Sequence, residues 1–238
     1  MGNRQISRII SGQATADGAG VRLRRYIGSA ELDQIDPFLL LDFFESDNPN
    51  DYIAGFPSHP HRGFETVTYL LAGKVRHEDN AGHGGIIETG GIQWMTAGRG
   101  IIHSEMPEQE HGRLAGFQLW VNLPATEKMC PPAYHEYPAS EIPTEIRDNG
   151  TTLRVITGAT SAQTIGPVQG VATDPVYLDV TLPADCTLTE PMPNGHTAFI
   201  FVIDGELTLP DGENTPALLS ATQLGTLKIG RASCRERV

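Results

Sequence analysis

The chain has 238 residues, of which 39% are hydrophobic and 19% are charged, and it contains 26 Gly and 17 Pro. This composition favours a globular protein with many turns and few long helices, and the length allows one or two domains. The formal net charge of −12 argues against direct nucleic-acid binding and against binding to an anionic membrane surface. Three scattered cysteines, together with the absence of a sufficiently apolar segment, lead us to expect a cytoplasmic protein without a membrane span.

Short segments rich in β-branched and aromatic residues recur along the chain and are separated by Gly, Pro, Asn and Asp. In chain order, the first set of predicted strands covers residues 5–10, 21–27, 38–44, 66–72, 74–79, 86–89, 92–97, 100–106 and 116–123. After a Pro-rich, acidic connection, the second set covers residues 152–158, 176–182, 197–203 and 205–210. We expect at most a single helical turn, over 29–36. The pattern predicts an all-β protein with two sheet-rich halves divided near residue 145, built as sandwiches, barrels or jelly rolls.

The last eleven residues, KIGRASCRERV, form a basic tail on an otherwise acidic chain. This string resembles the translation of a common sequencing-library adapter, and the alternative is a natural basic tail for nucleic acid or membrane. We expect that residues 228–238 are not native. The natural sequence would then be cut off near Leu227.

Two short motifs place metal-ligating side chains at alternate positions. In HPHRGFET, His59 and His61 stand two residues apart, and in GRGIIHSEM the same spacing relates His103 and Glu105. Residues i and i+2 of a strand face the same way, so two such pairs on neighbouring strands can converge as three imidazoles and one carboxylate. Such a set suits Fe, Mn, Co, Ni, Cu or Zn. An isolated H-x-H pair could have a purely structural role, but the presence of a second pair favours a metal site.

Four stretches of the chain resemble the signature sequences of the pirin family: residues 36–44, 56–82, 90–107 and 116–124. Pirins are bicupins of the cupin superfamily. The resemblance implies two tandem cupin jelly rolls (double-stranded β-helices), an N-terminal metal-binding domain over 1–145 and a C-terminal domain without a metal site over 146–227, incomplete at its end. It also implies one iron held by His59, His61, His103 and Glu105.

The remaining titratable residues of the motifs receive weaker roles. Many cupins ligate through the glutamate that corresponds to Glu65, but the resemblance favours Glu105 as the ligand, so we expect Glu65 in the second shell, where it could orient an imidazole. His77 is expected to be exposed or salt-bridged. The other histidines, which we expect in turns, loops or a strand start without a histidine partner, are His83, His111, His135 and His196.

The resemblance implies an iron(II)-dependent quercetin 2,3-dioxygenase, which opens a flavonol ring with O₂ and releases carbon monoxide. Glu105 is the expected general base. The alternative is a non-enzymatic, metal-dependent transcriptional co-regulator that binds a protein partner, because the same four ligands serve either role. The sequence alone does not select iron over nickel, manganese or copper.

Overall fold

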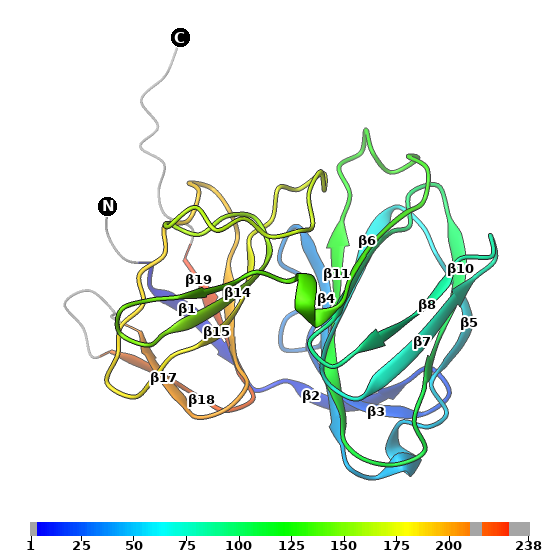
Figure 1. Cartoon of the computed structure of the whole chain (residues 1–238), viewed down its shortest axis with the longest axis horizontal. Helices are drawn as coiled ribbons and strands as arrows, with labels where there is room; N and C mark the ends of the chain where they lie inside the picture. Colours follow the sequence, from blue (N-terminus) through cyan, green and yellow to red (C-terminus); the bar gives the residue numbers. More distant parts are fainter. Residues whose placement is uncertain (1–3, 210–215, 229–238) are drawn as a thin grey trace.

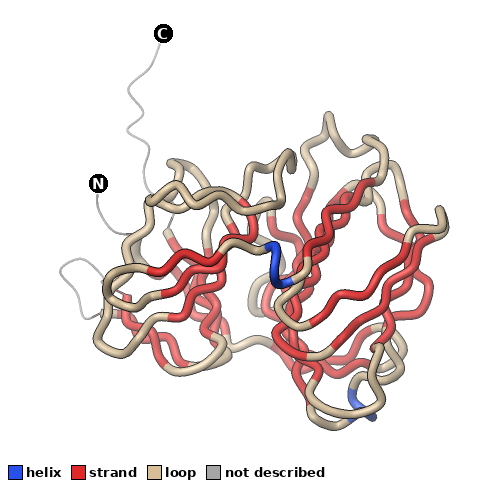
Figure 2. Tube along the Cα trace, viewed as in Figure 1, coloured by secondary structure: helices blue, strands red, loops and turns tan. Residues whose placement is uncertain are grey.

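The computed structural model describes residues 4–209 and 216–228. Over these residues the chain consists of β-strands and their connections, arranged as two groups of sheets side by side (Figure 1). Two short 3-10 turns, η1 (Pro49–Asp51) and η2 (Ala139–Glu141), are the helical segments of this described part (Figure 2). None of its helices has the length and apolar character that a membrane crossing needs.

The N-terminal half is a sandwich of two antiparallel sheets. The larger sheet has the order β12-β9-β6-β11-β4-β3-β2. In that order its strands span Ala133–Tyr137, Ile92–Thr96, Phe64–Ala72, Leu114–Asn122, Phe38–Ser46, Val21–Ile27 and Gln13–Asp17. The smaller sheet has the order β5-β10-β7-β8. Its strands span Phe56–His61, Ile101–Pro107, Lys74–Asp79 and Gly84–Glu88.

The C-terminal half contains two three-stranded sheets and a hairpin. The sheet β13-β14-β15 is formed by Thr144–Ile146, Thr152–Thr157 and Tyr177–Thr181. The sheet β1-β19-β16 is formed by Ile6–Ile10, Gln223–Leu227 and Phe199–Val202. The hairpin β17-β18 is formed by Glu206–Leu209 and Ala217–Ser220. Strand β1, near the start of the chain, therefore pairs with β19, which lies near the end of the described residues, before the chain crosses into the N-terminal half.

The seven-stranded sheet is buried on both faces, as strand β6 illustrates. Successive side chains of a strand point to opposite faces. Leu70 packs into the core between the two layers of the N-terminal half, whereas Val67 and Tyr69 pack into a second core with Ile156 and Leu224 of the C-terminal half. The two halves therefore share one apolar core, which supports the sheet that faces the site described below.

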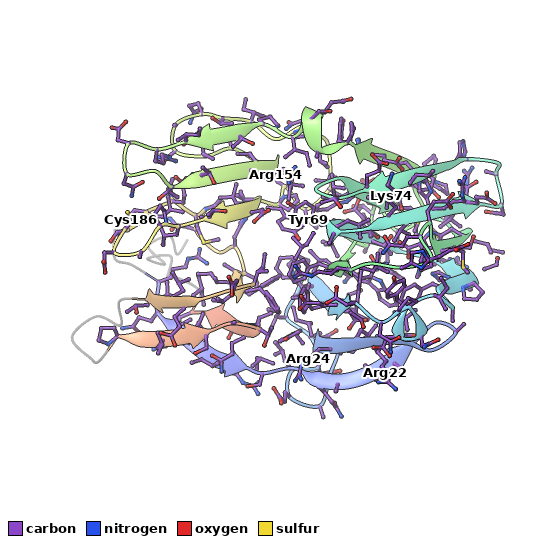
Figure 3. The ribbon with its side chains drawn as sticks, turned by 60° about the horizontal axis from the view of Figure 1, so that its bottom comes forward. Arg22, Arg24, Tyr69, Lys74, Arg154 and Cys186 are labelled. Carbon is purple, nitrogen blue, oxygen red and sulfur yellow. The ribbon has the colours of Figure 1, made fainter. Side chains whose placement is uncertain are left out.

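Polar contacts join the halves beside this shared core. The Tyr69 hydroxyl donates to Asp179 at 2.5 Å, and the Arg154 guanidinium donates to the Tyr69 oxygen at 3.0 Å and to the Gly90 carbonyl at 2.7 Å. Figure 3 shows Arg154 close to Tyr69, where the two halves meet. Burial, followed by the Asp179 charge, raises the pKa of the Tyr69 phenol well above its usual range, so Tyr69 stays a neutral donor.

The all-β prediction is confirmed, and every predicted strand overlaps an observed one. Two details of the sequence analysis are wrong. The supposed connection after residue 131 contains strand β12, which pairs with β9, and the helical turn expected over 29–36 is absent there, the turns lying at η1 and η2 instead. The division near residue 145 stays a prediction, and the expected non-native tail lies outside the described residues from 229 onward.

Replacement of Phe117 by alanine tests the shared core. Phe117 is 5% exposed, and its ring centroid lies 5.0 Å from that of Phe43 and 4.9 Å from that of Phe201 in the C-terminal half. Phe117→Ala is expected to lower the free energy of unfolding by about 3–5 kcal/mol, because it removes buried apolar contacts and leaves a cavity. Urea unfolding followed by tryptophan fluorescence measures this change.

The matched control is Ile146→Ala, since the Ile146 side chain is 72% exposed. It is expected to change the unfolding free energy by less than about 0.5 kcal/mol. Equal effects of the two substitutions would contradict the shared core.

Candidate metal centre

Three histidines converge inside the N-terminal sandwich. One ligand atom from each of His59, His61 and His103 lies within 4.8 Å of the other two. The ring centroids are 4.7 Å apart for His59 and His61, 4.5 Å for His59 and His103, and 5.0 Å for His61 and His103. The predicted convergence of these three side chains is thus present in the structure.

Antiparallel pairing of β5 with β10 brings the histidines together. His59 of β5 stands directly opposite His103 of β10, and directly opposed residues present their side chains on the same face. His61 lies two residues after His59 and shares that face. Two neighbouring strands therefore supply three imidazoles without a flexible loop.

Three buried nitrogen atoms of the cluster are left without protein partners. Among the described residues, Nε2 of His61 and both ring nitrogens of His103 are buried and have no hydrogen-bond partner. Buried polar atoms of folded proteins are normally hydrogen-bonded, so orphaned nitrogens at one point indicate a missing ligand. Nδ1 of His59 lies 2.8 Å from the Pro57 carbonyl, to which it can donate, leaving Nε2 with its lone pair.

Burial also sets the protonation of two of the imidazoles. It lowers the pKa of His61 to about 4 and that of His103 to about 3, and repulsion from the neighbouring histidines acts in the same direction. Both rings are therefore neutral near pH 7. Neutral imidazole is the form that ligates metals.

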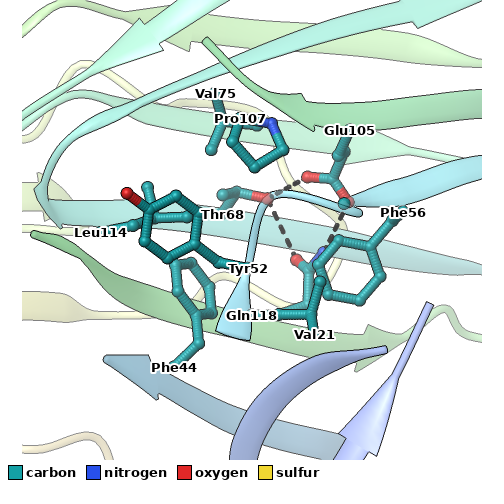
Figure 4. A pocket seen from close by; sticks show the side chains of 11 residues that line it. Val21, Phe44, Tyr52, Phe56, Thr68, Val75, Glu105, Pro107, Leu114 and Gln118 are labelled. Carbon is teal, nitrogen blue, oxygen red and sulfur yellow. Dashed lines mark hydrogen bonds between the residues drawn. The ribbon is translucent and has the colours of Figure 1, made fainter. Parts of the chain in front are cut away.

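Glu105 lies two residues after His103 on β10 but is held by other groups. Its carboxylate is buried and accepts hydrogen bonds from the Thr68 hydroxyl at 2.8 Å and from the Gln118 amide at 2.9 Å (Figure 4). The pairing of β10 with β5 shifts between His103 and Glu105, so the second motif is not a simple copy of the first. The four-residue ligand set stays a prediction, since only the three histidines meet the 4.8 Å criterion within the described chain.

Thr68 and Gln118, which we call the Glu105 clamp, belong to strands β6 and β11 of the facing sheet. The Thr68 oxygen also lies 3.1 Å from Oε1 of Gln118. Because a hydroxyl has a single hydrogen, it serves one of the two acceptors at a time, and the carboxylate is the stronger acceptor. The clamp thus satisfies both Glu105 oxygens and fixes the carboxylate next to the histidines.

Glu65 occupies a different place from the one expected. It lies on β6, is 1% exposed, and accepts a hydrogen bond from the Thr96 hydroxyl at 2.7 Å. Phe64, the preceding residue, packs against the His61 ring at 5.2 Å. Adjacent residues of a strand point to opposite faces, so Glu65 faces away from His61, and none of its hydrogen bonds in the described chain reaches an imidazole. Burial raises the pKa of its carboxyl group.

His77 of β7 is a further interior group, and the sequence analysis assigned it only in part. Its Nε2 lies 2.5 Å from a Glu136 carboxylate oxygen, so the expected acidic partner is present, and the residue is 3% exposed rather than solvent-facing. Its ring stacks against that of Tyr134. Its Cα stands opposite that of Glu105 in the pairing of β7 with β10. The alternation along β7 puts His77 on the same face as the apolar Val75, which is a sign of burial. The register of β7 with β10 could not be read from the sequence.

Aromatic rings border the cluster. The Phe64 and Trp120 rings lie 4.7 Å apart, and their centroids are 5.2 and 5.3 Å from that of His61. Both residues belong to the facing sheet and are partly buried. The cluster therefore has an aromatic wall on one side.

Comparison with known proteins supports a family assignment. The family model described as Pirin matches residues 20–121. A pirin-like protein of Caulobacter vibrioides is 52% identical over 93% of this chain and 80% of its own length. The chain belongs to the pirin family. Human pirin is 44% identical over 88% of this chain and 70% of its own length.

Solved structures show the same fold for this pirin-family chain. A quercetin 2,3-dioxygenase from Acinetobacter baumannii superimposes with a TM-score of 0.83 at 32% identity, covering 95% of this chain and 80% of that protein. The predicted fold of two tandem cupin jelly rolls is thereby confirmed. The predicted incompleteness of the second one stays a prediction.

The residues of the cluster fit a divalent metal ion. Three converging imidazoles, of which His61 and His103 are neutral and present unpaired nitrogens, form a donor set that transition metals prefer over magnesium or calcium. Among first-row metals the imidazoles alone do not discriminate, because affinity order and cellular supply decide the occupant. The structure therefore supports a divalent metal site in this pirin-family chain without naming the metal.

Removal of single histidines tests the site. His61→Ala and His103→Ala are each expected to weaken Co(II) or Zn(II) binding by more than about a hundredfold. Loss of a group that only supports a ligand costs up to about a hundredfold, and loss of a ligand should cost more. Competition titration with a chelating dye measures the affinity. His111→Ala, at an exposed position, is the matched control and should bind metal as the parent does. Unchanged affinity in the His103 variant would contradict the site.

Loss of one arm of the clamp tests how Glu105 is held. Gln118→Leu is expected to lower the free energy of unfolding of the metal-free chain by about 1–3 kcal/mol, because a buried carboxylate loses a donor. Urea unfolding measures it, and Gln13→Leu at an exposed position of β2 is the control. Equal stability of the two variants would mean that Gln118 does not support the carboxylate.

Proposed function

We propose that this pirin-family chain is a metal-dependent quercetin (flavonol) 2,3-dioxygenase that uses iron(II). The observation that carries the proposal is the convergence of three imidazoles, two of them buried with unpaired nitrogens, beside a clamped carboxylate. The likeness in fold and sequence to a structure described as a quercetin 2,3-dioxygenase supports the choice of reaction. Iron suits this role because oxygen chemistry favours a redox-active metal, and non-haem iron oxygenases combine histidine with carboxylate ligands.

In the proposed site, His59, His61 and His103 hold the metal and Glu105 completes its ligand set. A bound iron(II) supplies Lewis acidity and a template for the flavonol and O₂. The protein buries the imidazoles of His61 and His103, and it adds an aromatic wall of Phe64 and Trp120 on which a planar ring can pack.

Glu105 is proposed to take the proton of the flavonol 3-hydroxyl group. A carboxylate can act as a base when it is ionised and within hydrogen-bond reach of the substrate. The Glu105 clamp keeps the carboxylate in one orientation through its two hydrogen bonds. Loss of this proton prepares the ring for opening by O₂, with release of carbon monoxide.

The direct test is anaerobic loading of the chain with Fe(II), followed by quercetin and air. The proposal predicts loss of the flavonol absorbance together with carbon monoxide release. Metal binding without turnover would overturn the enzyme and favour the alternative, a metal-dependent protein-binding module with a regulatory partner.

Replacement of Glu105 by glutamine tests its role. Glu105→Gln keeps the size of the side chain but removes the base, so kcat is expected to fall by about 10²–10⁴-fold. The matched control is Glu65→Gln, which makes the same change at a buried position that faces away from the histidines. We expect the Glu65→Gln control to retain kcat within about threefold. This change is far smaller than the loss expected when a general base is removed. Equal losses in the two variants would remove Glu105 from the base role.

A further inference from the structure

A small cavity lies beside Glu105 in the core of the N-terminal half. Its volume is about 30 Å³, and side chains of both sheets and of the segment around η1 line it (Figure 4). Glu105 and Pro107 of β10 line it, whereas His103 does not. The other lining residues are mostly apolar: Val21, Phe44, Tyr52, Gly55, Phe56, Thr68, Val75, Leu114 and Gln118.

The wall of the cavity is apolar even where polar residues contribute to it. The oxygen and nitrogen atoms of Glu105, Thr68 and Gln118 are engaged with one another, and the surface presented to the cavity is carbon. A buried water requires two to four polar partners, and apolar cavities of proteins stay dry and take apolar guests such as xenon. This cavity therefore favours a small apolar occupant over water.

Size restricts the occupant further. A single water needs about 10–15 Å³ of such volume, so a cavity of about 30 Å³ admits a diatomic gas. Pockets for molecules of flavonol size have about 300–1,000 Å³. The cavity thus cannot hold the proposed organic substrate.

The position of the cavity relates it to the histidine cluster. On β10 the interior residues follow one another as His103, Glu105 and Pro107, at alternate positions. His103 belongs to the metal centre, Pro107 to the cavity, and Glu105 touches the cavity while lying next to His103 in this series. A guest in the cavity would therefore contact Glu105, the next interior residue of β10 after His103.

We propose that this cavity is a binding pocket for dioxygen, which holds the gas beside Glu105 during the reaction. The proposal rests on the proposed dioxygenase function for its choice of gas. Dioxygen is apolar, which matches the wall of the cavity, and it is small enough for the volume of about 30 Å³. The competing explanation is a packing defect of the core that no ligand uses.

Xenon tests whether the cavity accepts an apolar atom at all. We expect the unsubstituted chain to bind xenon in this cavity, seen in crystals held under xenon pressure or by ¹²⁹Xe NMR. Val75→Ile, which adds one methylene to the wall, is expected to weaken xenon binding at least tenfold, with Val21→Ile as a second filling variant should the first not fold. Val180→Ile, the same change at a partly exposed position of β15, is the matched control. Absence of xenon from the wild-type cavity would overturn the proposal.

Dissolved dioxygen tests the gas itself without any variant. Dioxygen is paramagnetic, so its residence should enhance relaxation of the Val21 and Val75 methyl groups at least threefold more than that of the fully buried Val155 methyls in the C-terminal half. This readout needs no turnover, so it separates failure of the pocket from failure of the proposed function. Equal enhancement at all three valines would overturn the pocket.

In the iron-loaded chain, the filling variants should raise KM for dioxygen at least fivefold. Metal content and KM for quercetin should stay within twofold of the parent. An unchanged KM for dioxygen in variants that exclude xenon would show that the reaction does not use the cavity.

Discussion

Antiparallel pairing of β5 with β10 is the constraint on which the site depends. It sets His59 opposite His103, and strand geometry then adds His61 to the same face. A slip of one residue would turn the side chains of one strand to the opposite face. Burial of Ile101, His103 and Glu105 at alternate positions of β10, and the pairing of β10 with β7 on its other side, oppose such a slip.

The same arrangement carries an energetic cost that a metal can offset. Burying imidazole nitrogens without hydrogen bonds destabilises the folded chain. A metal ion that binds these atoms in the folded state alone shifts the equilibrium toward that state. The lowered pKa values of His61 and His103 act in the same direction. Near pH 7 the metal does not have to displace a proton from either ring. Site and fold are therefore thermodynamically coupled.

Much of the site could be predicted from the sequence, since it rests on spacing within single strands. The i and i+2 pattern placed His59 with His61, and the family resemblance linked them to His103. What could not be predicted depends on contacts between strands that no local pattern encodes. The Glu105 clamp comes from β6 and β11, and the partner of Glu65 comes from β9. Likewise, the pairing of β1 with β19 joins residues from opposite ends of the chain.

The central claim is that three imidazoles from β5 and β10 bind one metal ion. X-ray absorption spectroscopy of the chain loaded with one equivalent of Fe(II) tests it most directly, because the fine structure distinguishes imidazole from sulfur and from water oxygen. The account predicts a shell of nitrogen and oxygen atoms with multiple-scattering features of three imidazole rings. A spectrum with one imidazole or none, or with a sulfur neighbour, would contradict it.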